Sequence, residues 1–206
     1  MNNKLVGNLA GKVALVSGSG RGIGREVAIK LASEGASVVI NDLDADLASQ
    51  VVDEIVAGSE KSGAKAIACV GNVTDEGFGE RFVKTAVDSF SGLDIIVNNA
   101  GYTWDNVIQK VTDEQWYAMI DVHMTAPYRI LQAAQPYIKK FHAQEKNEGR
   151  EVFRKVVNIS SVSGLSGNAG QLAYAAAKAG VVGMTKTLCK EWGRYKVNVN
   201  AVAFGF

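Results

Sequence analysis

Tyr174 and Lys178 stand four residues apart in a segment whose small and apolar residues recur at helical spacing, at Ala173, Ala177 and Val181. Side chains four apart leave the same face of a helix, so the phenol and the ammonium group are within reach of each other. A free tyrosine has a pKa of about 10, and a neighbouring cation favours its phenolate. The pair therefore predicts proton transfer to or from an oxygen near neutral pH. The alternative is an exposed tyrosine and a solvated lysine on an ordinary helix.

Ser161 adds a hydroxyl group to this pair. It follows a predicted strand, Val156–Ser160, and precedes Tyr174 by 13 residues. Open α/β sheets place their reactive groups beyond the carboxyl ends of the strands, which is where Ser161 falls. Its hydroxyl can hydrogen-bond the same substrate oxygen that the tyrosine protonates. We expect the three groups to converge and to act on a carbonyl or an alcohol.

The elements that must position these groups alternate between strand and helix. Short apolar runs predict strands at residues 13–17, 37–41, 66–70, 95–98, 156–160 and 197–203. Helical periodicity predicts helices that include residues 23–34, 45–61, 113–145 and 172–193. Continuously apolar strands between helices indicate a parallel sheet covered on both faces. The prediction is one doubly wound, Rossmann-like α/β domain over residues 1–206, with strand order 3-2-1-4-5-6.

A glycine-rich turn follows the first predicted strand and opens the first predicted helix. It reads Ser17-Gly18-Ser19-Gly20-Arg21-Gly22-Ile23-Gly24. Glycines let the backbone turn tightly and approach a diphosphate, while the helix points its first N–H groups at the anion. Such a turn alone is weak evidence, but its place in the first strand–helix unit predicts dinucleotide binding. The candidate cofactor ligands are Gly18, Ser19, Gly20, Arg21, Gly22, Ile23 and Gly24.

Asp42 ends the second predicted strand, 18 residues after Gly24. A carboxylate at this point accepts hydrogen bonds from the adenosine ribose hydroxyls and repels a 2′-phosphate, which favours NAD over NADP. The alternative is an acid that caps the following helix, as expected for Asp44 and Asp46.

Composition excludes several other classes of function. The 206 residues carry 22 basic and 21 acidic side chains, a net charge of +1, which favours neither nucleic acid nor an anionic membrane as partner. The apolar residues form short runs, and the first residues lack the apolar core of a signal peptide. Cys69 and Cys189 have neither metal-binding nor redox spacing, and we expect buried thiols. A cytoplasmic location is expected.

These motifs together resemble the short-chain dehydrogenase/reductase family. The resemblance rests on Ser161 with Tyr174-x-x-x-Lys178, on the glycine spacing, and on Asn98-Asn99-Ala100-Gly101 after the fourth strand. It implies an NAD(P)-dependent oxidoreductase in which Tyr174 protonates the substrate oxygen. Lys178 then lowers the pKa of that tyrosine and holds the nicotinamide ribose, and Ser161 orients the carbonyl.

The resemblance also implies a substrate class and further cofactor contacts. It is nearest the branch that reduces 3-oxoacyl thioesters, with a hydroxysteroid or other secondary alcohol as the alternative. It implies that Asn72 and Val73 contact the adenine and that Asn99, Ala100 and Gly101 line the cofactor cleft. Arg21 favours NADP, because a basic residue there often accompanies that cofactor in related sequences. A nucleotide-binding protein without turnover is the alternative from another class.

His123 occupies the position where the family has a fourth catalytic residue, an asparagine in a helix kink. The main-chain carbonyl of that residue holds a water molecule that links the active-site lysine to solvent. Pro127 has no N–H to bond the carbonyl of His123 four residues earlier. We expect the relay to run through the His123 backbone, while the imidazole packs or hydrogen-bonds locally. An ordinary interior histidine in a bent helix is the alternative.

The resemblance bears on assembly and on the end of the chain. Residues 113–145 and 172–193 correspond to helices that pair across two-fold axes, so a homodimer or homotetramer is expected. The family reads Pro-Gly at Phe204-Gly205 and continues into a substrate-covering segment and a seventh strand. We therefore expect a fragment, and a natural short form is the alternative.

Overall fold

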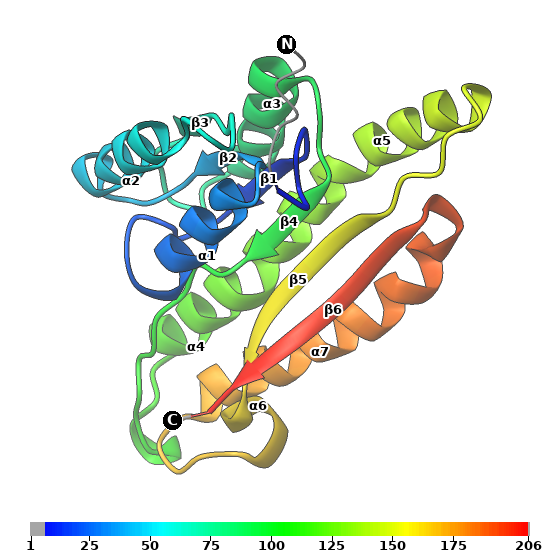
Figure 1. Ribbon diagram of the computed structural model, residues 1–206. Coiled ribbons are helices and arrows are strands. Elements are labelled where there is room, and N and C mark those ends of the chain that lie inside the picture. The colour runs from blue at the N-terminus through cyan, green and yellow to red at the C-terminus, as the bar shows by residue number, and fades with distance from the viewer. Residues whose placement is uncertain (1–6, 206) are drawn as a thin grey trace. The chain divides into compact units, whose positions relative to one another are not determined.

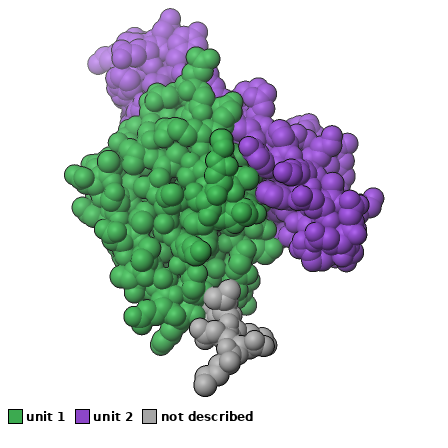
Figure 2. Space-filling view, turned by 90° about the horizontal axis from the view of Figure 1, so that it is seen from above, with its two compact units in different colours: residues 1–100 green, residues 101–206 purple. Residues whose placement is uncertain are grey.

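The computed structural model describes residues 7–205, which divide into two compact units between Ala100 and Gly101 (Figure 2). The expectations for the first six residues and for Phe206 lie outside the described part. Between residues 7 and 205, no helix is both long enough and apolar enough to cross a bilayer.

The first unit alternates strands and helices from its first strand onward (Figure 1). Its elements are β1 (Val13–Val16), α1 (Gly22–Ser33), β2 (Ser37–Ile40), α2 (Ala45–Gly58), β3 (Ala66–Ala68), α3 (Phe78–Phe90) and β4 (Ile95–Asn98). β1 pairs in parallel with both β2 and β4, and β2 pairs in parallel with β3. All residues of β1 and β4 are buried, as expected for strands that are covered on both faces.

The second unit carries two long strands and the longest helices. Its elements are η1 (Ile108–Lys110), α4 (Asp113–Ile120), a π-helix η2 (Asp121–Thr125), α5 (Ala126–Asn147), β5 (Arg154–Ser161), α6 (Val162–Ser166), α7 (Leu172–Trp192), η3 (Gly193–Tyr195) and β6 (Val197–Phe204). β5 and β6 pair in parallel from Arg154 and Val197 to Ser161 and Phe204. In Figure 1 they run as a yellow and a red arrow side by side.

The strand order is β3-β2-β1-β4-β5-β6, which confirms the predicted order and the doubly wound fold. The predicted strands and helices agree with those observed to within a few residues. α7 buries Ala173, Ala177 and Val181, the stripe that predicted it.

The long helix predicted over residues 113–145 is divided into three parts. Thr112 caps α4 by a capping box with Gln115, as its hydroxyl accepts from the Gln115 N–H at 3.2 Å. The π-helix η2 follows, and at its end the Ala126 N–H donates to the carbonyl of Asp121, five residues back. Pro127 lies just beyond, at the start of α5, where its missing N–H costs little. The expected bend therefore takes the form of a π-helix that contains His123.

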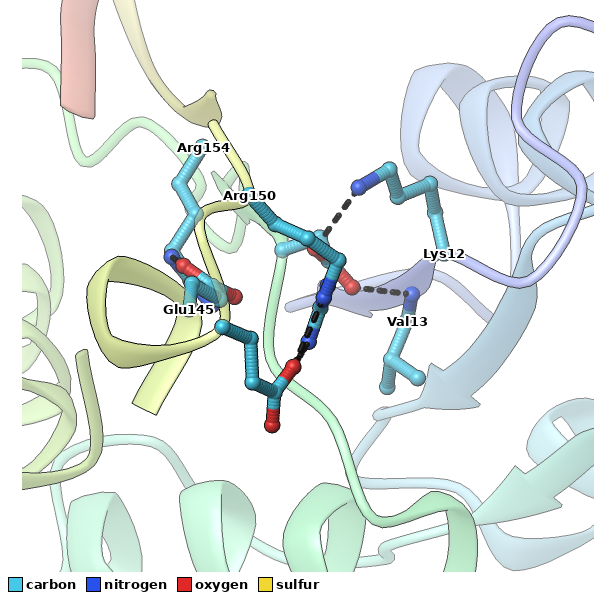
Figure 3. A network of polar contacts seen from close by, with 7 residues as sticks. Lys12, Val13, Glu145, Arg150 and Arg154 are labelled. Carbon is cyan, nitrogen blue, oxygen red and sulfur yellow. Dashed lines mark hydrogen bonds and ion pairs between the residues drawn. The ribbon is translucent and has the colours of Figure 1, made fainter. Parts of the chain in front are cut away.

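The charged stretch 139–155 is not fully solvated, contrary to what its composition indicates. Arg154 and Glu145 are both buried and form a two-pronged ion pair with N–O distances of 2.9 and 2.6 Å (Figure 3). The guanidinium also lies 5.6 Å from the centre of the Phe141 ring. This pair joins the end of α5 to the start of β5. By contrast, the pair between Arg150 and Glu148 is exposed.

The expectation of two buried thiols is half wrong. Cys69 is buried just after β3, whereas Cys189 is exposed. Cys189 lies near the end of α7, where its Sγ lies 3.1 Å from the Lys186 carbonyl oxygen. Its neighbours in sequence are largely solvent-exposed, which a prediction based on residue type alone does not detect.

Candidate active site

The glycine turn of the first unit packs closely against itself and against the residues that follow β4. Gly18 has a φ of +60°, and a Cβ there would lie 2.7 Å from the Ala100 Cα. A Cβ on Gly24 would come closer than 3.0 Å to the Gly18 carbonyl and to the Asn99 side chain. Both positions therefore require glycine, one for its backbone conformation and both for space.

The start of α1 suits an anion. Arg21 is the N-cap residue but its side chain makes no capping hydrogen bond, and the first turn contains no acid. The first N–H groups of this 12-residue helix thus have no capping side chain, and the helix dipole adds positive potential at the same point. Gly22 and Ile23 open the helix, while Ser19 and Gly20 form the turn before it. The start of α1 therefore fits a diphosphate, while the N–H groups of Ser19 and Gly20 are bonded to Asn41 and Asp42.

Residues after β4 fix the shape of that turn. The Asn99 Nδ2 donates to the carbonyl oxygens of Ser17 and Gly18, at 3.0 and 2.9 Å. The Ser17 hydroxyl accepts from the N–H groups of Asn99 and Ala100. Asn99 and Ala100, which were predicted as cofactor ligands, thus also hold the glycine turn in place.

Asn41 is a further positioning residue that the sequence reading missed. Its Oδ1 accepts from the Gly18 N–H at 3.2 Å, and its Nδ2 donates to the carbonyls of Cys69 and Gly71 at 3.1 and 3.0 Å. The side chain is buried and joins the loops after β1 and β3. A polar residue that ends an apolar strand was the available signal.

Asp42 and Asn72 lie on the loops after β2 and β3. Asp42 accepts from the N–H of Gly20 at 3.1 Å and from that of Asp44 at 3.2 Å. The N-cap of α2 is Asp44, so Asp42 is not the capping acid. The Asn72 Oδ1 accepts from the Thr74 N–H at 3.0 Å, which shapes its own turn, and Val73 beside it is buried.

In the second unit, Lys178 is fixed between α7 and β5. Its Nζ donates to the Ile159 carbonyl at 2.7 Å, and its own carbonyl accepts from the Ser160 hydroxyl at 2.8 Å. The Nζ lies 5.6 Å from the centre of the Tyr174 ring, so helical spacing does bring these two groups together. The side chain is buried, and this burial lowers the pKa of the Lys178 ammonium from 10.5 to about 8.

Ser161 ends β5 and is the N-cap residue of α6. Its Oγ accepts from the Ser163 N–H at 3.2 Å, which leaves the hydroxyl proton for another acceptor. α6 packs closely on α7, because a Cβ on Gly164 would lie 2.7 Å from the Lys178 carbonyl carbon. Ser161 and Lys178 thus belong to two elements in direct contact.

The His123 imidazole lies against Tyr174 and the segment Gly101–Tyr102. Its Nε2 lies 2.7 Å from the Tyr102 carbonyl oxygen, which can only accept, so this nitrogen carries the proton. The ring meets Tyr174 edge-on, with centroids 5.1 Å apart, and a Cβ on Gly101 would clash with it. The imidazole therefore hydrogen-bonds locally, as expected.

His123 is a neutral group in this setting. Burial, followed by the positive charge of Lys178, lowers the pKa of His123 from 6.5 to about 3, while the bond to the Tyr102 carbonyl opposes this shift. The Nδ1 atom is a buried acceptor without a hydrogen-bond partner in the described part of the chain. The imidazole thus provides a ring contact to Tyr174 and an unpaired acceptor atom, and it carries no charge.

Known proteins are similar to this chain over nearly its whole length. The family profile described as short chain dehydrogenase matches residues 12–206. A hydroxyacyl-CoA dehydrogenase, ChsB1, of Mycobacterium tuberculosis is 42% identical over 95% of the chain, which spans 61% of that relative. A 3-oxoacyl-[acyl-carrier-protein] reductase of Synechocystis sp. is 42% identical over 96% of the chain, which spans 75% of it.

The solved structures agree. A short chain dehydrogenase from Mycobacterium avium superposes with a TM-score of 0.87 at 38% identity, over 97% of this chain and 69% of that one. The chain belongs to the short-chain dehydrogenase family.

Proposed function

We propose that the chain is an NAD(P)-dependent oxidoreductase that interconverts a carbonyl group and a secondary alcohol. The observation that carries this proposal is the buried Lys178 ammonium beside the Tyr174 ring, where its described hydrogen-bond partner is a carbonyl rather than a carboxylate. A buried cation with a lowered pKa, next to a phenol, is typical of a site for proton transfer.

Each side chain has a role in this reaction. Ser161 donates a hydrogen bond from its hydroxyl group to the substrate oxygen and so orients the carbonyl. Tyr174 gives that oxygen a proton during reduction and takes it back during oxidation. Lys178 favours the phenolate by its charge and holds the nicotinamide ribose. The nicotinamide, when bound, supplies or accepts the hydride.

Other residues hold the cofactor and support the site. We assign the diphosphate to the turn Gly18–Gly24, the adenosine ribose to Asp42, and the adenine to Asn72 and Val73. Asn99, Ala100 and Gly101 line the cofactor cleft in this proposal. The main-chain carbonyl of His123 holds the water that relays protons to Lys178.

The substrate is proposed to be a 3-oxoacyl thioester, the class named in the Synechocystis relative. The test gives the purified chain acetoacetyl-CoA and NADH and follows the loss of NADH absorbance, which we expect to be steady and to require the enzyme. Turnover of a hydroxysteroid without reduction of the thioester would replace this substrate by the alternative one. Tight NAD binding without turnover of any carbonyl compound would refute the proposed catalysis.

NAD is the proposed cofactor because of the Asp42 carboxylate. We expect kcat/KM with NADH to exceed that with NADPH at least tenfold, since a carboxylate beside a 2′-phosphate costs several kcal/mol. Asp42→Asn removes the charge but keeps an oxygen that can accept from Gly20, so it should raise kcat/KM for NADPH by about tenfold or more. Steady-state kinetics with both cofactors measure this ratio.

Asp46→Ala serves as the control for this experiment. It removes one exposed acid from the first turn of α2, and we expect the NADH to NADPH ratio to stay the same. Equal use of both cofactors by the unaltered chain, or the same shift in both variants, would contradict the role of Asp42.

The pH dependence follows from the lowered pKa of Lys178. As pH rises through about 8, the Lys178 ammonium loses its proton and with it the positive charge that favours the phenolate formed during reduction, so we expect kcat/KM for carbonyl reduction to fall. His123 stays neutral above about pH 5, since its pKa is about 3, so it should add no second inflection to the pH profile of kcat/KM. A pH profile of kcat/KM measures both points, with His123→Asn for comparison. If kcat/KM of the unaltered chain changed between pH 5 and 7, and this change disappeared in His123→Asn, the imidazole would titrate in that range and would not be neutral throughout it.

A homodimer or homotetramer through residues 113–145 and 172–193 is also proposed. Tyr117 on α4, Tyr128 on α5 and Leu172 on α7 are exposed to 61%, 49% and 43%. Large apolar side chains on these helices suit an isologous contact.

A further inference from the structure

Two loops of the second unit are joined beside the proposed catalytic residues. The Asn106 N–H donates to the Gly170 carbonyl at 2.7 Å, and Asn106 and Gln171 form a parallel β-bridge. One loop precedes η1, and the other leads from α6 into α7. The bridge ends three residues before Tyr174.

The Gln171 amide group is the centre of this connection. Its Oε1 accepts from the Ser163 hydroxyl at 2.8 Å and from the Asn168 amide at 3.1 Å. Its Nε2 donates to the Asp105 carboxylate at 2.9 Å. Because a carboxylate can only accept, Asp105 fixes which end of the amide faces which partner.

These bonds connect Gln171 with Ser161, and the position of Gln171 connects it with the helix that carries Tyr174. Ser163 donates its hydroxyl proton to Gln171 and its N–H to the Ser161 Oγ, so Gln171 is two hydrogen bonds away from Ser161. Gln171 is also the N-cap residue of α7, the helix that carries Tyr174. One side chain thus connects the element that orients Ser161 with the helix that positions the phenol.

We propose that Gln171 is a positioning residue, which holds Ser161 and Tyr174 in their reactive arrangement and is itself held by Asp105. This inference rests on the proposed function, because Gln171 would position the Ser161 hydroxyl and the Tyr174 phenol to bind one substrate carbonyl. Misplacement of a reacting group by about 1 Å can cost about a hundredfold in rate. The hydrogen bond to Asp105 connects Gln171 to the loop that precedes η1, so the position of Gln171 depends on that loop.

The test exchanges hydrogen-bond donors and acceptors between Gln171 and Asp105. Gln171→Glu faces Asp105 with a second carboxylate, and we expect kcat to fall about ten- to hundredfold while KM for NADH stays the same. Adding Asp105→Asn to that variant restores a donor facing an acceptor, and kcat should return to within about threefold of the original. Gln171→Leu, which removes all three bonds, should lose kcat as Gln171→Glu does. Gln109→Glu adds the same charge on an exposed residue of η1 and serves as the control.

A second measurement does not depend on turnover. Hydrogen exchange of the Asn106 N–H, in the full chain, should be faster in Gln171→Glu and slow again in the double variant. Unchanged kcat in Gln171→Leu, or no recovery in the double variant, would overturn the positioning role. If the unaltered chain reduces no carbonyl compound, the proposed function fails, and unchanged exchange in Gln171→Glu would overturn the link through Asp105 separately.

Discussion

Tyr174→Phe is expected to lower kcat for carbonyl reduction by about a thousandfold while the chain still binds NADH. The substitution removes one oxygen and keeps the ring, so the edge contact with His123 is retained. General acid–base catalysis contributes about 10² to 10⁴ in rate, and the loss should lie in this range because Tyr174 is the proposed proton donor. The measurements are kcat from steady-state kinetics and Kd for NADH from fluorescence.

Tyr195→Phe provides the matched control for this loss. Tyr195 lies in η3, and its described contacts, with His142 and Arg194, involve its ring and not its hydroxyl. We expect unchanged kinetics in this variant. If Tyr174→Phe kept more than about a tenth of the rate, the phenol would not be the proton donor, whatever the cofactor affinity.

Glu145→Gln is expected to lower the free energy of unfolding by about 3 to 5 kcal/mol, because it removes the negative charge that forms a buried ion pair with Arg154. Arg154 is 4% exposed, so its guanidinium would remain buried beside an uncharged amide. For a chain of this size, about 1 kcal/mol corresponds to about 2 to 4 °C in Tm, so a fall of about 6 to 20 °C is expected. Thermal and urea unfolding followed by circular dichroism measure the effect.

Two further variants show whether burial is the reason. Glu148→Gln breaks the exposed pair with Arg150 and should change stability by less than about 1 kcal/mol. Replacing both buried partners, with Glu145→Leu and Arg154→Met, should be less destabilising than Glu145→Gln, since neither charge of the pair then has to be buried. Equal losses in Glu145→Gln and Glu148→Gln would show that the buried pair contributes no more than a surface one.

The fold was predictable because each local pattern agrees with the final structure. β1 and β4 are short apolar runs, and they lie in the sheet where continuous burial is required. The apolar stripe of α7 predicted both the helix and the shared face of Tyr174 and Lys178. What failed was the environment of individual charged and polar residues. The partner of Arg154 lies nine residues earlier in sequence, on another element, and composition alone carries no such information.

The positions of the candidate residues were predictable where a motif fixes both residue type and spacing. Tyr174 and Lys178 lie one helical turn apart, and the glycine turn directly precedes α1. Asn41 and Gln171 were missed as positioning residues because their roles depend on partners that become neighbours only when distant loops meet. The neutral state of His123 likewise follows from its burial and then from the charge of Lys178, and the sequence shows neither of these surroundings.

The π-helix Asp121–Thr125 also determines how α4 and α5 keep a common phase. An ideal α-helix turns about 100° per residue, so a stripe of residues spaced by four moves forward around the helix by about 40° at each step. A wider π turn absorbs part of this drift, and Met119, His123 and Ile130 all remain buried. Deleting one residue between 121 and 125 would close this wider turn to an ordinary α-helical one, whereas a deletion inside α4 or α5 would rotate the residues on its two sides by about 100° against each other. Related chains should therefore accept the loss of one residue in this short segment more readily than in the helices beside it.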